Sequence, residues 1–483
     1  MYKAYITVLT NVRKHPNADR LLLADCFGNT ICVSTDYFEG QVGVYFPTDG
    51  QLSVEFAEKN NLVRKKDDAG NNIGGYMDPD KRNVTAIRLR GEKSDGLFLP
   101  ISCLNYCFAH GDASIELFVG DVIEGLVNGH EICCKYIPRS NKRAYSTGAG
   151  NKTRKHKVAV APMFAEHADT EQLAYNLSAF KPGDHIEITL KMHGTSQRTA
   201  HLPVLIGYED TAMCKLRNAW MKMWSELFPK FFSYEEEHDG EPVYDYGYVS
   251  GTRRVVLEDY SGGFYGSNEF REQHSKIFEG KLWKGETVYY EVVGFTTSGA
   301  PIMSTANNSK LQDKEFIKQY GKETVFSYGC APNGTKRMYG EDEHGRYMID
   351  MAAPQSDVYV YRMTMTNPDG EVVEYTPDFM RYRCEQMAVK TVPVFANVVL
   401  PCEEYFDEEH SVGEYVKAMA EQYYDGPDPI GKTHVREGVV VRIINRAKFA
   451  AYKHKNFSFK VLEGIAKVEA EAPDMEESQE VEE

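Results

Sequence analysis

The chain has 483 residues, of which 42% are hydrophobic and 26% are charged, a composition typical of globular proteins with two to four domains. Its formal net charge of -16 argues against a protein that coats nucleic acid with its whole surface, although a net charge can hide local basic patches. No apolar run approaches the roughly 20 residues of a membrane-spanning helix and no C-x-x-C pair is present, so we expect a cytoplasmic protein without a membrane partner or a zinc site.

Residues 1–137 contain short runs of β-forming residues separated by Gly, Asn and Asp. The runs are AYITVLTNV, TICVST, VGVYFP, VTAIRLRG and GLFLPI. Such short strands at close spacing predict a small antiparallel barrel.

Two segments contain few apolar residues that could be buried in a core. Residues 138–157 are basic and rich in Gly, Ser and Asn, which predicts a linker that is either simply solvated or in contact with nucleic-acid phosphates. Residues 463–483 are strongly acidic, which predicts a disordered, solvated tail.

Between these segments, residues 158–462 mix helical and strand patterns. The stretches HADTEQLAYNLSAF and CKLRNAWMKMWSELFPKFF have helical spacing, and IEITLK, TVYYEVVGF, DVYVYRMTMTN and EGVVVRII predict strands. The chain is therefore expected to belong to the α+β class. Residues 201–250, 301–351 and 401–434 carry weaker patterns and are interpreted as insertions.

The strand IEITLK ends at Lys191, and Met-His-Gly-Thr-Ser follows. This pattern fits a solvated turn, but it also fits a lysine that acts as a nucleophile in a phosphate pocket. A lysine amine attacks phosphorus only when it is deprotonated, which neighbouring cations and partial burial favour. Gly194 would allow the backbone to approach a ligand closely.

Three later strands carry charged residues that suit the same chemistry. Glu291 lies in YYEVVGF and can accept hydrogen bonds from a ribose. Glu437 lies at the start of an apolar strand, where a carboxylate can hold a metal or orient an amine. Lys453 and Lys455 alternate and therefore share one face of a strand, as binding to a triphosphate requires. Each of these residues alone is equally well explained as an exposed strand residue.

The segments KMHGTS, YYEVVG, EGVVVR and YKHK together resemble motifs I, III, IV and V of the covalent nucleotidyltransferases, which include ATP-dependent DNA and RNA ligases and mRNA capping enzymes. The histidine of KMHG and the paired lysines of YKHK are similar to those of RNA ligases. HPNADRL resembles a loop common in OB-fold tRNA-binding modules, although it also fits a Pro-Asn turn that caps a strand. GVYFPTDGQL and GEKSDGLFLP are similar to the N-terminal OB-like domain of the Deinococcus-type RNA ligase family.

The resemblance implies an OB-like nucleic-acid-binding barrel at residues 1–137 and a basic linker at 138–157. It implies an adenylyltransferase domain of antiparallel sheets with flanking helices at residues 158–462, followed by the acidic tail at 463–483. No C-terminal OB domain of the DNA-ligase kind is recognised after the paired lysines.

The resemblance also implies roles for individual residues. Lys191 would form the lysyl-adenylate, Glu437 would bind metal and help activate the lysine, and Lys453 and Lys455 would contact the ATP phosphates. The remaining ATP-binding residues would be Thr189, Gly194, Glu291 at the ribose, Arg253 at the nucleotide or a 5′-phosphate, and Tyr361 stacked on adenine, with Tyr359 as the alternative to Tyr361.

The implied activity is ATP-dependent ligation of a 3′-OH RNA end to a 5′-phosphate end through lysyl-AMP and an adenylylated polynucleotide, in RNA repair. The implied cofactors are ATP and Mg2+ or Mn2+, and the partner is RNA, including nicked RNA/DNA or RNA/RNA duplexes, bound by a monomer. Two alternatives remain: another covalent nucleotidyltransferase, either a DNA ligase or a capping guanylyltransferase, and a non-catalytic OB-fold RNA-binding protein.

Overall fold

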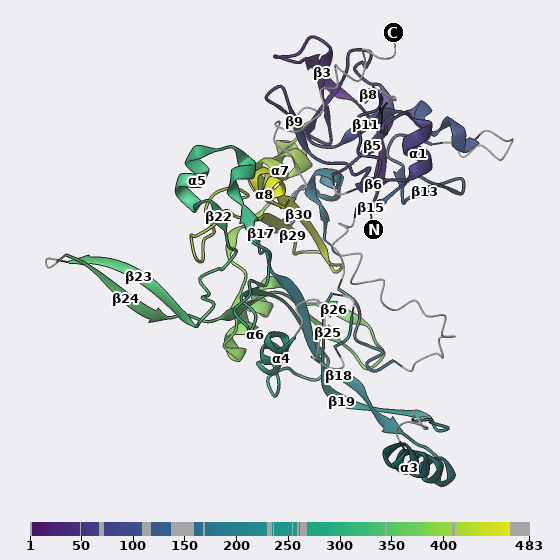
Figure 1. Ribbon diagram of the computed structural model, residues 1–483, viewed down its shortest axis with the longest axis vertical. Coiled ribbons are helices and arrows are strands. Elements are labelled where there is room, and N and C mark those ends of the chain that lie inside the picture. The colour runs from purple at the N-terminus through teal and green to yellow at the C-terminus, as the bar shows by residue number, and fades with distance from the viewer. Residues whose placement is uncertain are drawn as a thin grey trace.

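A computed structural model gives the arrangement of the chain (Figure 1). It describes residues 2–48, 50–66, 72–108, 117–136, 159–167, 170–228, 234, 236–253, 255–257, 260, 268–342, 345–407 and 411–463. The linker expected at residues 138–157 and the tail expected at 463–483, apart from Glu463, lie outside this range. No helix of the described residues has the length and apolar character needed to cross a membrane.

Short antiparallel strands make up most of the N-terminal part, as the sequence predicts. Two sheets have the orders β11–β5–β1–β12 and β2–β3–β4. Their strands are β1 (Ala4–Val8), β2 (Thr10–Lys14), β3 (Leu21–Cys26), β4 (Asn29–Ser34), β5 (Val42–Phe46), β11 (Leu97–Pro100) and β12 (Val122–Ile123). Two-stranded pairs are formed by β6 (Gly50–Leu52) with β15 (Cys133–Lys135), β7 (Lys65–Lys66) with β8 (Asn72–Gly74), β9 (Ile87–Leu89) with β10 (Glu92–Ser94), and β13 (Leu126–Val127) with β14 (His130–Glu131).

The expected OB-like barrel is not confirmed, because the strand pairings within the described residues do not close. The four-stranded sheet ends at β11 and at β12, and the three-stranded sheet is separate from it. Helix α1 (Val54–Lys59), the 3-10 helix η1 (Ile101–Phe108) and these strands instead surround a shared apolar core. Ile6, Phe46 and Phe56 lie in this core with no exposed surface.

The rest of the chain contains two larger sheets, and these include every strand that carries a predicted motif. The five-stranded sheet has the order β16–β30–β29–β17–β28, and the other has the order β19–β18–β20–β25–β26, with β27 joined to β25. The strands are β16 (Glu171–Gln172), β17 (His185–Lys191), β18 (Thr195–Tyr208), β19 (Pro242–Gly251), β20 (Glu286–Gly294), β25 (Ser356–Thr366), β26 (Val372–Glu374), β27 (Lys390–Thr391), β28 (Val394–Val399), β29 (Gly438–Ile443) and β30 (Ala450–Lys455).

The three expected insertions contain regular elements of their own. The helices within them are α3 (Ala212–Leu227), η4 (Asn308–Leu311), α5 (Lys314–Tyr320), η5 (Glu403–Tyr405) and α7 (Val412–Glu421). Outside them lie α4 (Glu269–Lys276), α6 (Pro377–Met387) and α8 (Phe457–Leu462). The additional strands are β21 (Ala306–Asn307), β22 (Glu323–Thr324), β23 (Thr335–Asp342) and β24 (Gly345–Ala352). Helix α3 confirms the predicted helix in the aromatic-rich segment.

The helix predicted from HADTEQLAYNLSAF is wrong. Its described residues form β16 and the 3-10 turns η2 (Leu173–Tyr175) and η3 (Leu177–Ala179). The side chain of Asn176 donates to Gln172 O at 2.8 Å, a local bond that competes with a continuing helix. The apolar residues serve two different cores, because Leu173 packs against the five-stranded sheet and Tyr175 packs against N-terminal aromatic residues.

Polar contacts hold the N-terminal strands against helix α8 and helix α7. Lys460 Nζ of α8 donates to Asp95 Oδ2 at 3.0 Å, and Lys93 Nζ lies 3.4 Å from the same oxygen. Asp95 is only 2% exposed. Lys417 Nζ of α7 donates to Gly28 O at 2.6 Å. The N-terminal part is therefore docked on the larger sheets by direct contacts.

We expect Asp95→Ala to destabilise the protein, because it leaves the Lys460 ammonium without its buried counter-charge. Burial alone would raise the pKa of Asp95, but Lys460 and Lys93 lower it to about 2. Urea unfolding at neutral pH should show a loss of about 3–5 kcal/mol. The folded pKa lies below the unfolded value, so this stabilisation is present above about pH 4 and disappears as the pH falls toward 2.

The matched control is Glu58→Ala, which removes an exposed carboxylate from α1 and should change stability by less than about 0.5 kcal/mol. Equal unfolding midpoints for wild type and Asp95→Ala would contradict the assigned role of this ion pair.

Candidate active site

One face of the five-stranded sheet brings three of the predicted motifs together. Lys191 of β17 pairs with Gly438 of β29, and Gly438 pairs with Lys455 of β30. Paired residues on neighbouring strands share a face, as do alternate residues of one strand. The adjacent row on that face consists of Thr189, Val440 and Lys453.

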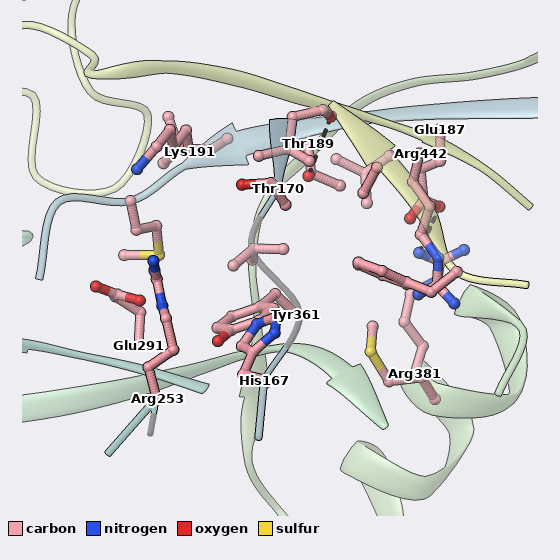
Figure 2. A pocket seen from close by; sticks show the side chains of 18 residues that line it. His167, Thr170, Glu187, Thr189, Lys191, Arg253, Glu291, Tyr361, Arg381 and Arg442 are labelled. Atoms are coloured by element: carbon pink, nitrogen blue, oxygen red, sulfur yellow. Dashed lines mark hydrogen bonds and ion pairs between the residues drawn. The ribbon is translucent and has the colours of Figure 1, made fainter. Parts of the chain in front are cut away.

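The six-stranded sheet supplies the opposite wall of a cavity (Figure 2). Glu291 of β20 and Tyr361 of β25 line it together with Arg253, which follows β19, and His167. Lys191 points into this space from the other sheet. The residues expected from motifs I and III, the adenine-stacking position and the expected arginine therefore meet in one cavity.

A β-bulge sets the position of the aromatic residue in this wall. Tyr289 of β20 pairs with Arg362 of β25, whereas the next residue, Tyr290, pairs with Val360. Tyr361 is thus the extra residue between two pairs, and such an insertion redirects a side chain locally.

The two candidate tyrosines consequently have different surroundings. The Tyr361 hydroxyl lies 2.9 Å from Ser196 Oγ, and its ring stacks on His167 with a centroid distance of 5.4 Å and an interplanar angle of 25°. Tyr359 is 5% exposed and packs into a hydrophobic core, and it is not among the described residues that line the cavity. The geometry favours Tyr361 over Tyr359 for contact with a base.

At the end of the cavity, Lys191 forms an ion pair with a buried carboxylate. Lys191 Nζ lies 2.7 Å from Glu437 Oε1, and Lys455 Nζ lies 3.2 Å from the same oxygen. The Glu437 side chain is 2% exposed, against 22% for Lys191 and 13% for Lys455. The expected nucleophile, the expected metal-binding carboxylate and one expected phosphate-binding lysine are therefore in direct contact.

The charges in this cluster lower the pKa values of Glu437 and Lys453. Burial alone would raise the pKa of Glu437, but Lys191, Lys455 and His193 outweigh burial and hold that pKa well below its usual range. Burial lowers the pKa of Lys453 to about 8, and the charges of Lys191 and Lys455 act in the same direction. An ionised carboxylate therefore lies among crowded cations next to Lys191 at the cavity, which suits a site for a polyanion.

Two glycines allow neighbouring strands to lie close together at the site. Gly438 has φ +150°, and a Cβ atom there would lie 2.1 Å from His454 O. A Cβ atom on Gly194 would lie 2.4 Å from Val292 O of β20. The close approach at Gly194 is thus made with the neighbouring strand, whereas the sequence analysis expected it with a ligand.

His193, the histidine of KMHG, is held firmly beside Glu437. Its Nδ1 atom lies 3.4 Å from Glu437 Oε2 and 3.8 Å from Glu463 Oε1. Its ring contacts Phe326 and Phe459 edge-on, each with a centroid distance of 4.6 Å. One ligand atom each from His193, Glu437 and Glu463 lies within 4.8 Å of the others, so these three residues could hold a metal ion.

The floor of the cavity contains charged residues that the sequence analysis missed. Glu187 Oε2 lies 2.7 Å from Arg381 Nη1, and Arg442 pairs with Glu187 across β17 and β29. Glu187 alternates with Thr189 and Lys191, so the strand period could have identified it and, through the pairing, Arg442. Arg381 on α6 and His167 in a loop carry no comparable pattern.

No protein-family model and no curated protein matches this chain. Solved structures with a similar fold include a Naegleria gruberi RNA ligase with pyrophosphate, with a TM-score of 0.51, 15% identity, and coverage of 95% of this chain and 97% of that chain. A variant of that ligase without ligand has a TM-score of 0.52, 16% identity and coverages of 95% and 96%. A variant with AMP and manganese has a TM-score of 0.50, 15% identity and coverages of 95% and 98%. The chain therefore has the fold of an RNA ligase over nearly its whole length.

Glu291→Gln should make the protein more stable at alkaline pH. Burial raises the pKa of Glu291 to about 7 from the usual 4.5, although Lys191 opposes this shift. Between these two values the folded chain binds a proton that the unfolded chain lacks, so stability falls as the pH rises through this window. Thermal or urea unfolding from pH 4 to 8 should show a smaller decline for the variant, with a gain of about 1–3 kcal/mol at pH 8.

Glu315→Gln, which changes an exposed carboxylate on α5, serves as the control and should keep the wild-type pH dependence. Parallel curves for wild type and Glu291→Gln would show that Glu291 is not the group that titrates in this window.

Proposed function

We propose that this protein is an ATP-dependent RNA ligase. The observation that carries the proposal is the Lys191–Glu437 ion pair of 2.7 Å at the end of a cavity whose opposite wall carries Glu291 and Tyr361. The paired lysines of β30 lie on the same sheet face as Lys191. The fold shared with the Naegleria gruberi RNA ligase supports this proposal.

In the first step, the Lys191 ammonium gives a proton to solvent and leaves its ion pair with Glu437. The neutral amine then attacks the α-phosphorus of ATP, a P–N bond forms, and the bond from the α-phosphorus to the pyrophosphate oxygen breaks, so that pyrophosphate leaves. Tyr361 stacks on the adenine, and Glu291 accepts hydrogen bonds from the ribose. Lys453 and Lys455 stabilise the negative charge of the phosphates. Glu437 holds the amine in place at the end of the cavity until ATP is bound.

The residues around Glu437 also suit a divalent cation. Glu437 Oε2 accepts no hydrogen bond from the described residues, although the side chain is almost fully buried. Glu437 and Glu463 would supply carboxylate oxygens, which suit Mg2+ or Mn2+, and His193 would add a nitrogen, which Mn2+ accepts more readily than Mg2+. A bound cation would neutralise phosphate charge and compete with Lys191 for the carboxylate.

The next two steps join nucleic-acid ends. AMP passes from Lys191 to the 5′-phosphate of a polynucleotide, forming a new phosphoanhydride bond. A 3′-OH of RNA then attacks that phosphate and AMP leaves. We propose that the N-terminal strands act as an OB-like platform for RNA ends, nicked duplexes included, as in the Deinococcus-type RNA ligases, and that the reaction serves RNA repair in the cytoplasm.

The alternatives differ in measurable ways. A capping guanylyltransferase would attach GMP to the lysine, and a DNA ligase would seal DNA 3′-OH ends. A non-catalytic RNA-binding protein would form no covalent adduct. The buried contact between the nucleophile and its carboxylate favours the enzyme, because binding RNA alone would not require it.

Incubation with α-labelled ATP should label the protein covalently on a denaturing gel, and α-labelled GTP should not. Lys191→Ala should reduce labelling by several orders of magnitude, because the covalent nucleophile is lost. Lys181→Ala, an exposed lysine that precedes β17, is the matched control and should label normally. Full labelling of Lys191→Ala would rule out Lys191 as the nucleophile, and labelling by GTP would favour a capping enzyme.

Tyr361→Ala should raise the KM for ATP in the labelling reaction by the equivalent of about 1–3 kcal/mol, because a stacking partner is lost. Tyr361→Phe keeps the ring and loses only the bond to Ser196, so it should stay close to wild type. Tyr359→Ala should lower the melting temperature more than the ATP affinity, because Tyr359 packs in the core. A normal KM in Tyr361→Ala would contradict the stacking role.

A further inference from the structure

Helix α3 stands at the tip of an arm that projects from the six-stranded sheet (Figure 1). Strand β18 pairs with β20 only over residues 195–200, but its pairing with β19 continues to Tyr208. The outer halves of β18 and β19 therefore form a two-stranded arm, and α3 connects their ends. The helix lies away from the cavity, so its surface is not explained by the proposed ligase reaction.

Hydrogen bonds attach α3 to the arm. The Thr211 backbone N–H and side-chain hydroxyl donate to the two carboxylate oxygens of Asp239 at 3.0 and 2.7 Å. The Asn218 side chain donates to Glu237 O at 2.6 Å. Cys214 and Asn218 are the buried residues of the helix, at 3% and 7% exposure. The face that α3 turns toward its own chain is thus small and polar.

The opposite face of α3 is apolar and exposed to solvent. Its large apolar residues are Met213, Leu216, Trp220, Met223 and Leu227, with exposures of 76%, 68%, 58%, 46% and 62%. They follow one another at intervals of three and four residues, which is the spacing of the contact positions in a coiled coil. This arrangement reverses that of an ordinary surface helix, whose apolar face packs on its own domain.

We propose that this apolar stripe packs antiparallel against α3 of a second copy of the chain. An antiparallel pair centred between Trp220 and Met223 places Leu216 against Leu227 of the second copy and Trp220 against Met223. The thioether of Met packs favourably against aromatic rings. The projection of the arm leaves room for a second molecule to approach the helix (Figure 1).

The charges beside the stripe are compatible with this pairing. On one flank, Arg217 would lie beside Trp224 of the second copy, where a cation–π contact can form. On the other flank, Ala219 would lie beside Glu226. Within residues 212–227, no like charges meet across the pair, because Lys215 and Lys222 lie away from the stripe.

Nucleic acid is a poorer occupant of this surface. The cations Lys215 and Lys222 of α3 lie away from the stripe. The segment that follows the helix contacts it through Glu237 and Asp239 and also contains Glu236 and Glu241. These four carboxylates would repel a phosphate backbone.

The size of the surface also predicts the strength of self-association. A helix of 16 residues is about 24 Å long, so a helix pair buries less than the roughly 1,600 Å² of a standard stable interface. The dimer should therefore be weak. At low protein concentration it would dissociate into the monomer that the sequence predicts.

Sedimentation velocity of the full chain over the micromolar range tests the proposal. The sedimentation coefficient of the wild type should rise with concentration. Trp220→Glu places a charge at the centre of the stripe and should raise the dissociation constant by about tenfold or more. Lys215→Glu changes charge on the same helix outside the stripe and should associate like the wild type. Self-labelling with ATP should be equal in all three proteins, so this test is independent of the proposed function.

Cysteine pairs test the orientation. A mixture of Leu216→Cys and Leu227→Cys chains should form an interchain disulfide more readily than either variant alone. The wild type, with its exposed Cys134 and Cys402, gives the background.

Three results would overturn the proposal. The first is a wild type that stays monomeric at every concentration. The second is self-association that Trp220→Glu leaves unchanged. The third is quenching of tryptophan fluorescence by an RNA oligonucleotide or a synthetic amphipathic peptide, lost in Trp220→Glu, in a protein that does not self-associate. That result would assign the stripe to RNA or to a foreign helix.

Discussion

The candidate site depends on one buried carboxylate. Glu437 is almost inaccessible to solvent, yet it stays ionised because Lys191 and Lys455 contact the same oxygen. A buried charge without partners costs several kcal/mol, so these lysines and the carboxylate stabilise one another only as a group. Gly438 lets β30 lie close beside the residue that follows Glu437, since a Cβ atom there would be 2.1 Å from His454 O. The ion pairs hold Lys191 in position at the end of the cavity.

The cavity lies between two sheets that the turn after Lys191 joins, since the chain passes there from β17 of one sheet to β18 of the other. Gly194 lets the chain run close beside β20 as β18 begins, since a Cβ atom would be 2.4 Å from Val292 O. The bulge at Tyr361 then turns an aromatic ring toward the space between the sheets. One sheet thus supplies the lysines, while the other supplies an aromatic ring and the Glu291 carboxyl group, so the cavity needs both sheets.

The sequence predicted the parts of this site that follow from strand periodicity. Alternation identified the motif strands and placed Lys453 and Lys455 on one face, and the observed register extends that face to Lys191. The same alternation contained a signal for Glu187 that was missed. The choice between Tyr359 and Tyr361 could not be predicted, because a bulge depends on how two distant strands pair. The helix expected before β17 failed because its apolar residues serve two separate cores.

The docking of the N-terminal part near the candidate site could not be predicted either, since it depends on contacts between residues that are far apart in the sequence. Helix α8 connects them. Lys460 on this helix binds Asp95 of the N-terminal part, and Glu463 at its C-terminal end contacts Lys455 at 2.8 Å and His193 at 3.8 Å. A displacement of α8 relative to Asp95 would therefore also change the surroundings of Lys455 and His193, so the docking of the N-terminal part and the arrangement of charges around Glu437 depend on the same short helix.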